Sequence, residues 1–158
     1  MRVAILTISD SAFQGARPDA SGPAVAESCT RRGWRVVMTQ TVPDDATLIQ
    51  ARLIEAADTS MIDVLLTTGG TGLGPRDVTP EATMAVCSRL VPGLPEVMRA
   101  GSREANSRAA LSRAVAGIRG QVIILNLPGS PKGAVESLDA VADLLPHAAE
   151  VIRGARHD

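Results

Sequence analysis

A chain of 158 residues, 45% hydrophobic and 21% charged, is long enough for one globular domain and short for two. The formal net charge is −1 and the basic residues are scattered, with Phe13 and Trp34 the only aromatic side chains, so no nucleic-acid partner is expected. No apolar run reaches the ~18 residues of a membrane span, and Cys29 and Cys87 lack a metal-ligand spacing, so we expect a cytoplasmic protein with no membrane partner.

Short apolar runs alternate with helical patterns along the chain. The runs predict strands, buried on both faces, over residues 3–8, 34–37, 64–67 and 122–125. Helices are expected over about 21–32, 44–57, from Thr79 onward, 94–103 and 130–153, the last bent at Pro146. A further strand over 111–118 is expected to pair with 122–125 through the Arg119-Gly120 turn. This order predicts a single domain over 1–158, a three-layer α/β/α sandwich whose mostly parallel sheet has an antiparallel edge hairpin.

Polar and glycine-rich segments follow the predicted strands. Ser9 and Asp10 follow the first strand, Asp44 the second, residues 67–77 the third and residues 126–129 the last. Ligands of open α/β sheets bind beyond the carboxyl ends of the strands. We therefore expect these segments to meet in one site.

The segment LLTTGGTGLGPRDVTPEAT, Leu65 to Thr83, places four glycines within six positions. It contains neither the GxxxxGK[ST] spacing of a P-loop nor GxGxxG. Successive backbone N–H groups in such a loop can form a concave nest for a phosphate. A structural turn explains the glycines equally well, and the pattern alone does not separate the two interpretations.

Two aspartates lie close to this loop in the expected site. Thr79 is the better N-cap for the next helix, which leaves Asp77 without a structural role. A carboxylate beside a phosphate nest indicates a bridging cation, and Mg²⁺ takes one or two carboxylates together with phosphate oxygens. Asp44 and Asp45 either cap the helix after Pro43 or supply a second carboxylate facing Asp77.

Three other polar residues have less certain roles. Lys132, the only lysine, follows a Pro-Gly-Ser-Pro turn at a helix start, where it is either solvated or close to a bound anion. His147 and His157 are single and late in the chain, and we expect both on the surface.

Nearly the whole chain resembles the molybdopterin adenylyltransferase (MogA/MoaB) family. The similar segments are ISDSAFQG, DASGP, VPDD, LLTTGGTGLGPRDVTPEAT, LSRAVAGIRG and LNLPGSPKGA. The resemblance implies Mg²⁺-dependent transfer of AMP from ATP to the terminal phosphate of molybdopterin, with release of pyrophosphate. It also implies a homo-oligomer, a trimer, and a molybdenum insertase as a further partner.

The resemblance also assigns roles to individual residues. Asp44 and Asp77, in the PD and RD motifs, would be catalytic and would bind the metal. The nucleotide and its phosphates would be bound by Gly69, Gly70, Thr71, Gly72, Ser9, Asp10, Ser21 and Gly22. Molybdopterin would be bound by Ser112, Pro128, Gly129, Ser130 and Lys132.

Two alternatives belong to other functional classes. The chain could bind and deliver molybdopterin without adenylating it, as a MoaB-like protein. It could also be a nucleotide pyrophosphatase of the competence-damage type, which shares the fold. The intact Asp44 and Asp77 favour the adenylyltransferase.

Overall fold

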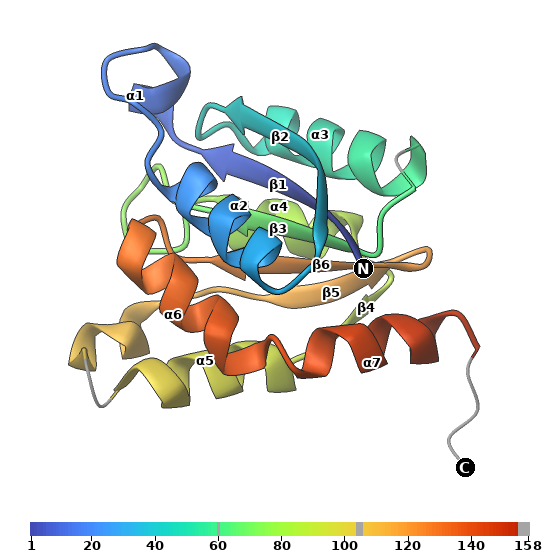
Figure 1. Ribbon diagram of the computed structural model, residues 1–158. Helices are drawn as coiled ribbons and strands as arrows, with labels where there is room; N and C mark the ends of the chain where they lie inside the picture. Colours follow the sequence, from blue (N-terminus) through green and yellow to red (C-terminus); the bar gives the residue numbers. More distant parts are fainter. Residues whose placement is uncertain (60, 104–105, 155–158) are drawn as a thin grey trace.

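The computed structural model describes residues 1–59, 61–103 and 106–154, which form one sheet between two layers of helices (Figure 1). The strands in this described part are β1 (Arg2–Ile8), β2 (Arg35–Val42), β3 (Val64–Thr68), β4 (Arg89–Leu90), β5 (Ala116–Arg119) and β6 (Val122–Leu127). The helices are α1 (Asp10–Phe13), α2 (Ser21–Arg31), α3 (Ala46–Thr59), α4 (Thr79–Val86), α5 (Gly93–Arg103), the 3₁₀-helix η1 (Ser107–Leu111), α6 (Pro131–Val141) and α7 (Leu144–Ile152).

The sheet has the strand order β2-β1-β3-β6-β5-β4. β2, β1, β3 and β6 are parallel neighbours, whereas β5 is antiparallel to both β6 and β4. Gly120, with φ +57°, forms the turn between β5 and β6. The predicted parallel sheet and antiparallel hairpin are therefore confirmed. The two-residue strand β4, which was not predicted, lies outside the hairpin and forms the edge.

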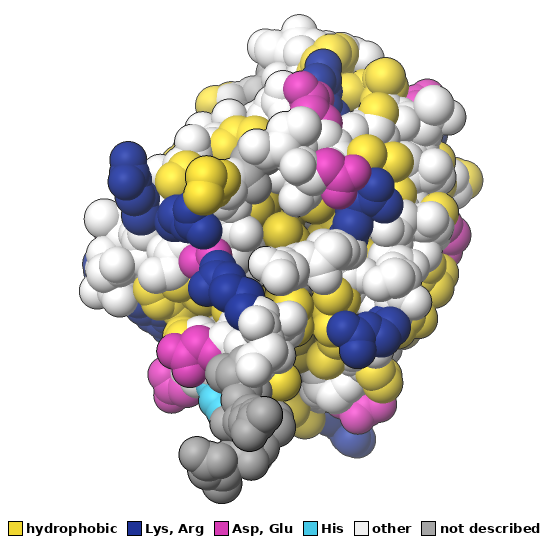
Figure 2. Space-filling view, turned by 90° about the vertical axis from the view of Figure 1, so that its right-hand side faces the viewer, with side chains coloured by type: hydrophobic (Ala, Val, Ile, Leu, Met, Phe, Trp, Pro, Cys, Tyr) yellow, Lys and Arg dark blue, Asp and Glu magenta, His cyan; other side chains and the backbone are white. Residues whose placement is uncertain are grey.

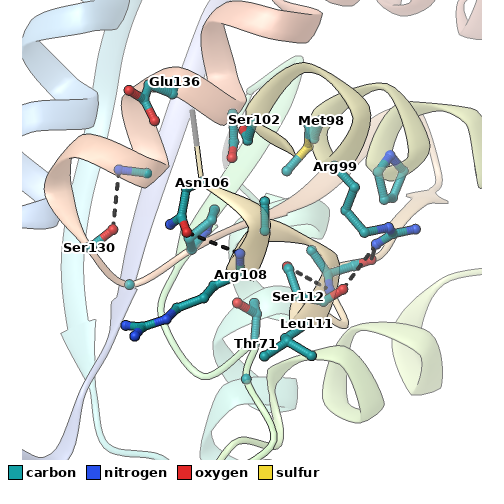
Figure 3. A pocket seen from close by; sticks show the side chains of 18 of the residues that line it. Thr71, Met98, Arg99, Ser102, Asn106, Arg108, Leu111, Ser112, Ser130 and Glu136 are labelled. Carbon is teal, nitrogen blue, oxygen red and sulfur yellow. Dashed lines mark hydrogen bonds between the residues drawn. The ribbon is translucent and has the colours of Figure 1, made fainter. Parts of the chain in front are cut away.

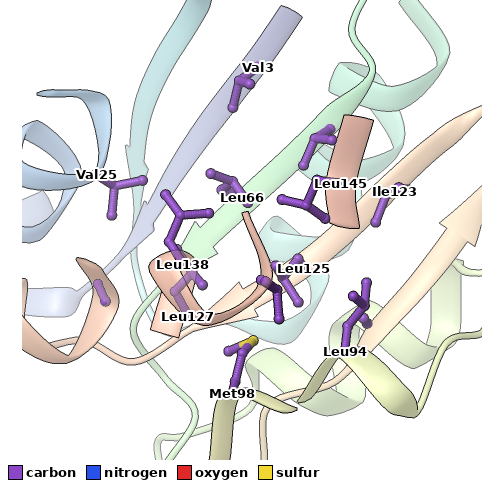
Figure 4. Close-up of a cluster of buried hydrophobic side chains, with 14 of the residues drawn as sticks. Val3, Val25, Leu66, Leu94, Met98, Ile123, Leu125, Leu127, Leu138 and Leu145 are labelled. Atoms are coloured by element: carbon purple, nitrogen blue, oxygen red, sulfur yellow. The ribbon is translucent and has the colours of Figure 1, made fainter. Parts of the chain in front are cut away.

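Two aliphatic cores, one on each face of the sheet, make the fold a three-layer sandwich. On one face α2, α5, α6 and α7 pack against β1, β3 and β6, and Leu66, Leu125 and Leu138 are fully buried there (Figure 4). On the other face α3 and α4 cover the sheet, with Ile49 and Leu53 fully buried. Strands β3 and β6 are buried along their whole length, as the apolar runs predicted.

Three element predictions were wrong in detail. β2 continues to Val42 and is largely exposed, because it is the outer strand and carries polar side chains that face solvent. Residues 107–111 form η1, so the strand expected over 111–118 is confined to β5. The last helix is divided at residues 142–143 and not at Pro146, which lies in the first turn of α7, where a missing N–H costs nothing.

The surface at the end of the molecule opposite the candidate site has mixed charge. Figure 2 shows basic and acidic side chains interspersed there with hydrophobic ones. No helix of the described segments is long and apolar enough to cross a membrane. His147 is exposed on α7, as expected, and His157 lies outside the described residues.

Candidate functional site

Two adjacent cavities open at the carboxyl ends of the parallel strands. The α1 cavity, of about 490 Å³, is lined mainly by residues of 7–12 and 17–21 together with Asp44. The α5 cavity, of about 520 Å³, is lined mainly by α5, η1 and the start of α6 (Figure 3). Gly70, Asp77 and Gly129 line both cavities. The segments after β1, β2, β3 and β6 therefore meet, as strand topology predicted.

The glycine loop, residues 69–74, forms the partition between the cavities. Gly69 and Gly70 have φ values of +105° and +64°, in the left-handed region that favours glycine. The Thr79 hydroxyl donates to the Gly69 carbonyl at 2.9 Å, and the Thr79 N–H donates to the Gly70 carbonyl at 3.1 Å. Thr79 is thus the first residue of α4 and anchors the loop. The expectation that it is the N-cap was wrong, since Val78 holds that position without a side-chain bond.

The backbone N–H groups of the glycine loop are available for a ligand. Those of Gly70, Thr71, Gly72 and Leu73 donate to no other group of the described residues. Thr71 is buried, and all four residues line the α5 cavity. A row of unpaired N–H groups at a cavity wall is a nest for an anion, which favours the phosphate-binding interpretation over a structural turn.

Asp77 lies beside the loop and between the cavities. Its Oδ2 accepts from the Gly74 N–H at 2.8 Å. A Cβ added to Gly72 or to Gly74 would lie 2.9 Å from the same oxygen. The glycines therefore make room for this carboxylate, and Asp77, thought to lack a structural role, closes the loop. Its other carboxylate oxygen has no hydrogen-bond partner among the described residues.

Asp44 reaches the α1 cavity from the turn after β2. Its Oδ2 accepts from the Asp10 N–H at 2.8 Å, and Asp10 Oδ1 accepts from the Asp44 N–H at 2.9 Å. Arg76 donates to both Asp10 oxygens, at 3.0 and 2.9 Å. Asp45, in contrast, caps α3, accepting from the Leu48 N–H at 2.9 Å. Of the two interpretations of this aspartate pair, helix capping therefore applies to Asp45, and Asp44 is the one whose carboxylate faces the cavity.

The carboxylates of the site differ in their electrostatics. Burial is the main factor that raises the pKa of Asp44 above its usual 3.8, and the charges of Asp10 and Asp77 act in the same direction. The hydrogen bond from the Asp44 N–H, followed by that from Arg76, lowers the pKa of Asp10. Because Arg76 is committed to Asp10, a cation would relieve the repulsion between Asp44 and Asp77.

The other residues expected to bind nucleotide are not all at the cavity. Ser9 and Ser21 line the α1 cavity. Asp10 does not, because its carboxylate is occupied by Arg76 and Asp44. Gly22 packs under Thr7 and Asp19, where an added Cβ would come within 2.5 Å of both side chains, and it lines a separate small hollow. In the structure Asp10 contacts Asp44 and Arg76, and Gly22 packs against Thr7 and Asp19.

Four of the five residues expected to bind molybdopterin line the α5 cavity: Ser112, Pro128, Gly129 and Ser130. Ser130 also caps α6, accepting from the Gly133 N–H at 3.2 Å (Figure 3). Lys132 is outside the cavity lining. Its side chain is 85% exposed and lies 3.8 Å from Glu136, which favours the solvated interpretation.

Several polar side chains that line the cavities were not predicted, and three of them have few or no partners. Arg17 lines the α1 cavity and binds only the Ser11 hydroxyl, and the Arg108 guanidinium at the α5 cavity has no partner within the described segments. The buried Ser102 hydroxyl on α5 also has none. Because arginine is frequent along the chain, neither arginine could have been identified from sequence. Ser102 lies on α5, whose sequence predicts a helix but gives no sign of a binding site.

Comparisons with known proteins agree with this arrangement. A family model described as a probable molybdopterin binding domain matches residues 4–147. The chain belongs to this family. It is 39% identical over 156 residues to a molybdopterin adenylyltransferase of Helicobacter pylori, covering 98% of this chain and 89% of that one. It is 42% identical over 145 residues to a molybdopterin adenylyltransferase of Escherichia coli, covering 90% of this chain and 74% of that one.

A solved structure shows the same fold. The molybdopterin biosynthesis enzyme MoaB of Thermus thermophilus superposes with a TM-score of 0.92 and 48% identity, covering 99% of both chains. Within this molybdopterin binding domain, the described residues contain no group of three or more His, Cys, Asp or Glu side chains arranged to hold a metal. A two-carboxylate arrangement such as Asp44 with Asp77 suits Mg²⁺ only when phosphate oxygens complete its coordination.

Proposed function

We propose that the chain is a molybdopterin adenylyltransferase, a nucleotidyltransferase of molybdenum cofactor synthesis. The observation that carries the proposal is the pair of cavities that meet at Gly70, Asp77 and Gly129. A transferase that joins two substrates needs two binding sites sharing one reaction centre. The similarity to curated molybdopterin adenylyltransferases at 39% and 42% identity supports the choice of substrates.

In this proposal each cavity takes one substrate. ATP occupies the α1 cavity, with Ser9, Ser21 and Arg17 beside it. Molybdopterin occupies the α5 cavity, with Ser112, Ser130 and Arg108 beside it. The phosphates of both substrates then meet at the glycine loop, whose unpaired N–H groups are suited to phosphate oxygens. The domain over residues 1–158 acts as one unit.

The reaction needs no nucleophile from the protein. An oxygen of the molybdopterin phosphate forms a bond to the α-phosphorus of ATP, and the bond from that phosphorus to the bridging oxygen of pyrophosphate breaks. Burial raises the pKa of the Cys29 thiol to about 11 and also raises that of Cys87, which disfavours the thiolate that a nucleophilic cysteine requires. The residues act by positioning and by charge stabilisation.

Asp44 and Asp77 would hold Mg²⁺, which would neutralise phosphate charge during the transfer. The fit rests on two observations. Both carboxylates line the α1 cavity, and the charge of Asp77 raises the pKa of Asp44. Asp10 and Arg76 fix the orientation of Asp44, while the Gly74 N–H fixes that of Asp77.

The proposal extends to the surroundings of the enzyme. The unpaired thiols Cys29 and Cys87 suit a reducing compartment, and we place the reaction in the cytoplasm. A molybdenum insertase would receive the adenylylated product, and three copies would form the enzyme.

One assay tests the proposed activity. Protein, ATP and Mg²⁺ are incubated with molybdopterin, and pyrophosphate release is measured. We expect stoichiometric pyrophosphate that depends on all components. Binding of molybdopterin without pyrophosphate would instead indicate a delivery protein. Cleavage of ADP-ribose without any pterin would indicate the pyrophosphatase.

A further inference from the structure

Arg113 contacts the glycine loop from the side opposite the cavities. It follows Ser112 in the segment between η1 and β5 and lines neither cavity. Its N–H donates to the Thr71 carbonyl at 2.8 Å. Its guanidinium donates from Nε to the Gly72 carbonyl at 2.7 Å and from Nη2 to the Asp77 carbonyl at 2.6 Å. Nη1 pairs with Glu81, in the first turn of α4.

We propose that Arg113 is a positioning residue for adenylyl transfer, which holds the glycine loop with its N–H groups turned toward the substrates and holds Asp77 beside them. The inference rests on the proposed function for its link to catalysis. The contacts that Arg113 makes with the glycine loop, Asp77 and Glu81 form a clamp. This clamp is independent of the proposed function, because it consists of contacts within the chain.

The planarity of the peptide bond connects Arg113 to the anion nest. In a trans peptide the carbonyl of one residue and the N–H of the next point in opposite directions. The backbone N–H of Arg113 holds the Thr71 carbonyl and its guanidinium holds the Gly72 carbonyl, so the N–H groups of Gly72 and Leu73 point away from Arg113. These are two of the four N–H groups without a partner among the described residues. One arginine thereby sets the polarity of the loop.

The position of Asp77 depends on the same contact. Its N–H donates to the Gly74 carbonyl at 3.0 Å, and its carboxylate accepts from the Gly74 N–H. Both of these bonds lie within the loop and leave it free to move as a unit. The bond from Arg113 Nη2 to the Asp77 carbonyl ties that unit to the β5 side of the sheet. It adds to the ties that Thr79 and Arg76 provide on either side of Asp77, and it is the one that acts on the Asp77 backbone directly from the β5 side.

Arg113 is itself held in place by neighbouring elements. Arg99 of α5 donates to the carbonyls of Ser112 and Ala114, at 3.3 and 3.1 Å, on either side of Arg113 (Figure 3). Glu81 binds the outer end of the guanidinium. The clamp thus connects α5, which lines the α5 cavity, to the glycine loop and to Asp77 beside it. Glycines make the loop permissive, and Arg113 restores the rigidity that phosphate transfer requires.

The planar fork of arginine is essential to this arrangement. Three nitrogens of one guanidinium reach Gly72, Asp77 and Glu81 in different directions, which a lysine ammonium on a flexible stem cannot reproduce. Arg119, the last residue of β5, provides a matched comparison. It also joins a carboxylate, Asp58, and donates to the Val86 carbonyl at 3.1 Å, but it does not contact the glycine loop.

The test compares Arg113→Met with Arg119→Met, because both remove a guanidinium that binds a carboxylate and a carbonyl. Amide hydrogen exchange of Gly74, Asp77 and Thr79, whose N–H groups are hydrogen-bonded within or to the loop, is measured in each variant without ligands. We expect exchange faster by about tenfold or more in Arg113→Met only. Equal exchange at these amides in both variants would overturn the clamp. This measurement needs no substrate, so it stands even if the chain does not adenylate molybdopterin.

The catalytic part is tested in the adenylation assay with the same variants. We expect kcat to fall about 10- to 100-fold in Arg113→Met, with a smaller change in the KM for ATP, because a loop displaced by about 1 Å affects the transition state most. Arg113→Lys should recover part of kcat. A kcat for Arg113→Met within about twofold of Arg119→Met would overturn the catalytic role. If Arg113→Met does not fold, Arg113→Lys and Glu81→Gln carry both comparisons.

Discussion

Asp10 and Asp44 each bind the backbone N–H of the other, at 2.9 and 2.8 Å. The reciprocal pair joins the turn after β1 to the turn after β2, two segments that are 34 residues apart. Arg76, from the glycine loop side, binds both oxygens of Asp10 and so completes the connection to the turn after β3. The ends of β1 and β3 are thus fixed relative to Asp44, which follows β2, before any ligand binds.

Burial makes the charged form of Asp44 costly for stability in spite of this pair, and Asp44→Asn should therefore stabilise the fold at neutral pH. An acid with a raised pKa makes the folded chain bind more protons than the unfolded one, so the free energy of unfolding falls as pH rises through that pKa. Asparagine can still accept from the Asp10 N–H. We expect a melting temperature higher by a few degrees at pH 7. The gain should shrink as pH falls and disappear well below 3.8, where Asp44 is protonated in both states.

The control for this prediction is Asp45→Asn, on the same turn but exposed and capping α3. It should change the melting temperature little at any pH. A stability difference for Asp44→Asn that is the same at pH 4 and pH 7 would contradict the electrostatic explanation. It would mean that packing, and not the charge, decides the effect.

Asp77→Asn should abolish most of the activity and leave the loop intact. The amide oxygen can replace Oδ2 as acceptor for the Gly74 N–H, but the neutral side chain is a poor Mg²⁺ ligand. We expect turnover in the pyrophosphate assay to fall by about 10²-fold or more, with an unchanged melting temperature. Asp45→Asn again serves as the control. Near wild-type turnover of Asp77→Asn at saturating Mg²⁺ would refute the assignment.

Substitutions in the glycine loop should separate backbone strain from loss of the site. Gly70 and Gly154 both have positive φ, so alanine at either should cost about 1–2 kcal/mol of stability. A Cβ at Gly70 would also lie 2.3 Å from the Thr79 hydroxyl, whereas one at Gly154 meets nothing within 4 Å. Calorimetric titration with a non-hydrolysable ATP analogue should therefore show weaker binding for Gly70→Ala only. Equal affinities would mean that the loop is merely a turn.

Gly72 requires a different comparison, because its φ is not positive and alanine there would meet no backbone strain. A Cβ there would press on the Asp77 carboxylate at 2.9 Å, while one at Gly93 meets nothing within 4 Å. Gly72→Ala should lower turnover by displacing Asp77, and Gly93→Ala should not. Unchanged turnover in Gly72→Ala would show that the carboxylate can move without consequence.

The sequence was sufficient for the sheet and for the place of the site. Apolar runs identify β3 and β6 because strands buried on both faces are mostly apolar, and strand ends then locate Asp44, Asp77 and the glycine loop. It was insufficient for β2, whose exposed edge position is set by its neighbours. It also could not reveal that the Thr79 hydroxyl bonds to Gly69 and not to its own helix, since both uses favour the same residue.

Side-chain partners decided most of the remaining differences. By residue type, Asp10 suits metal binding and Lys132 suits anion binding. In the structure, however, Arg76 pairs with Asp10, and the Lys132 side chain is exposed to solvent. Arg113 is one arginine among many in the sequence. Only the three-dimensional arrangement shows that it contacts Thr71, Gly72 and Asp77 from 36 to 42 residues away.

The last prediction concerns assembly. The apolar residues of α5 to α7 do not by themselves call for a partner subunit, because Leu94, Met98, Leu138 and Leu145 are buried within their own chain. The remaining argument is the family resemblance, together with Leu90 and Val97, which are 50% and 40% exposed on β4 and α5. Burying such side chains between copies would remove apolar surface from water.

A cyclic trimer of this 16.4 kDa chain would have a mass of about 49 kDa, with a heterologous interface around the three-fold axis. Light scattering after size exclusion at low micromolar concentration should give that mass. In the double variant Leu90→Ser with Val97→Ser, which keeps the internal core intact, the mass should fall toward that of one chain. A wild-type mass of one chain would end the trimer prediction, and a mass of six chains would mean that two rings stack. A trimer unaffected by the double variant would place the interface on a different surface.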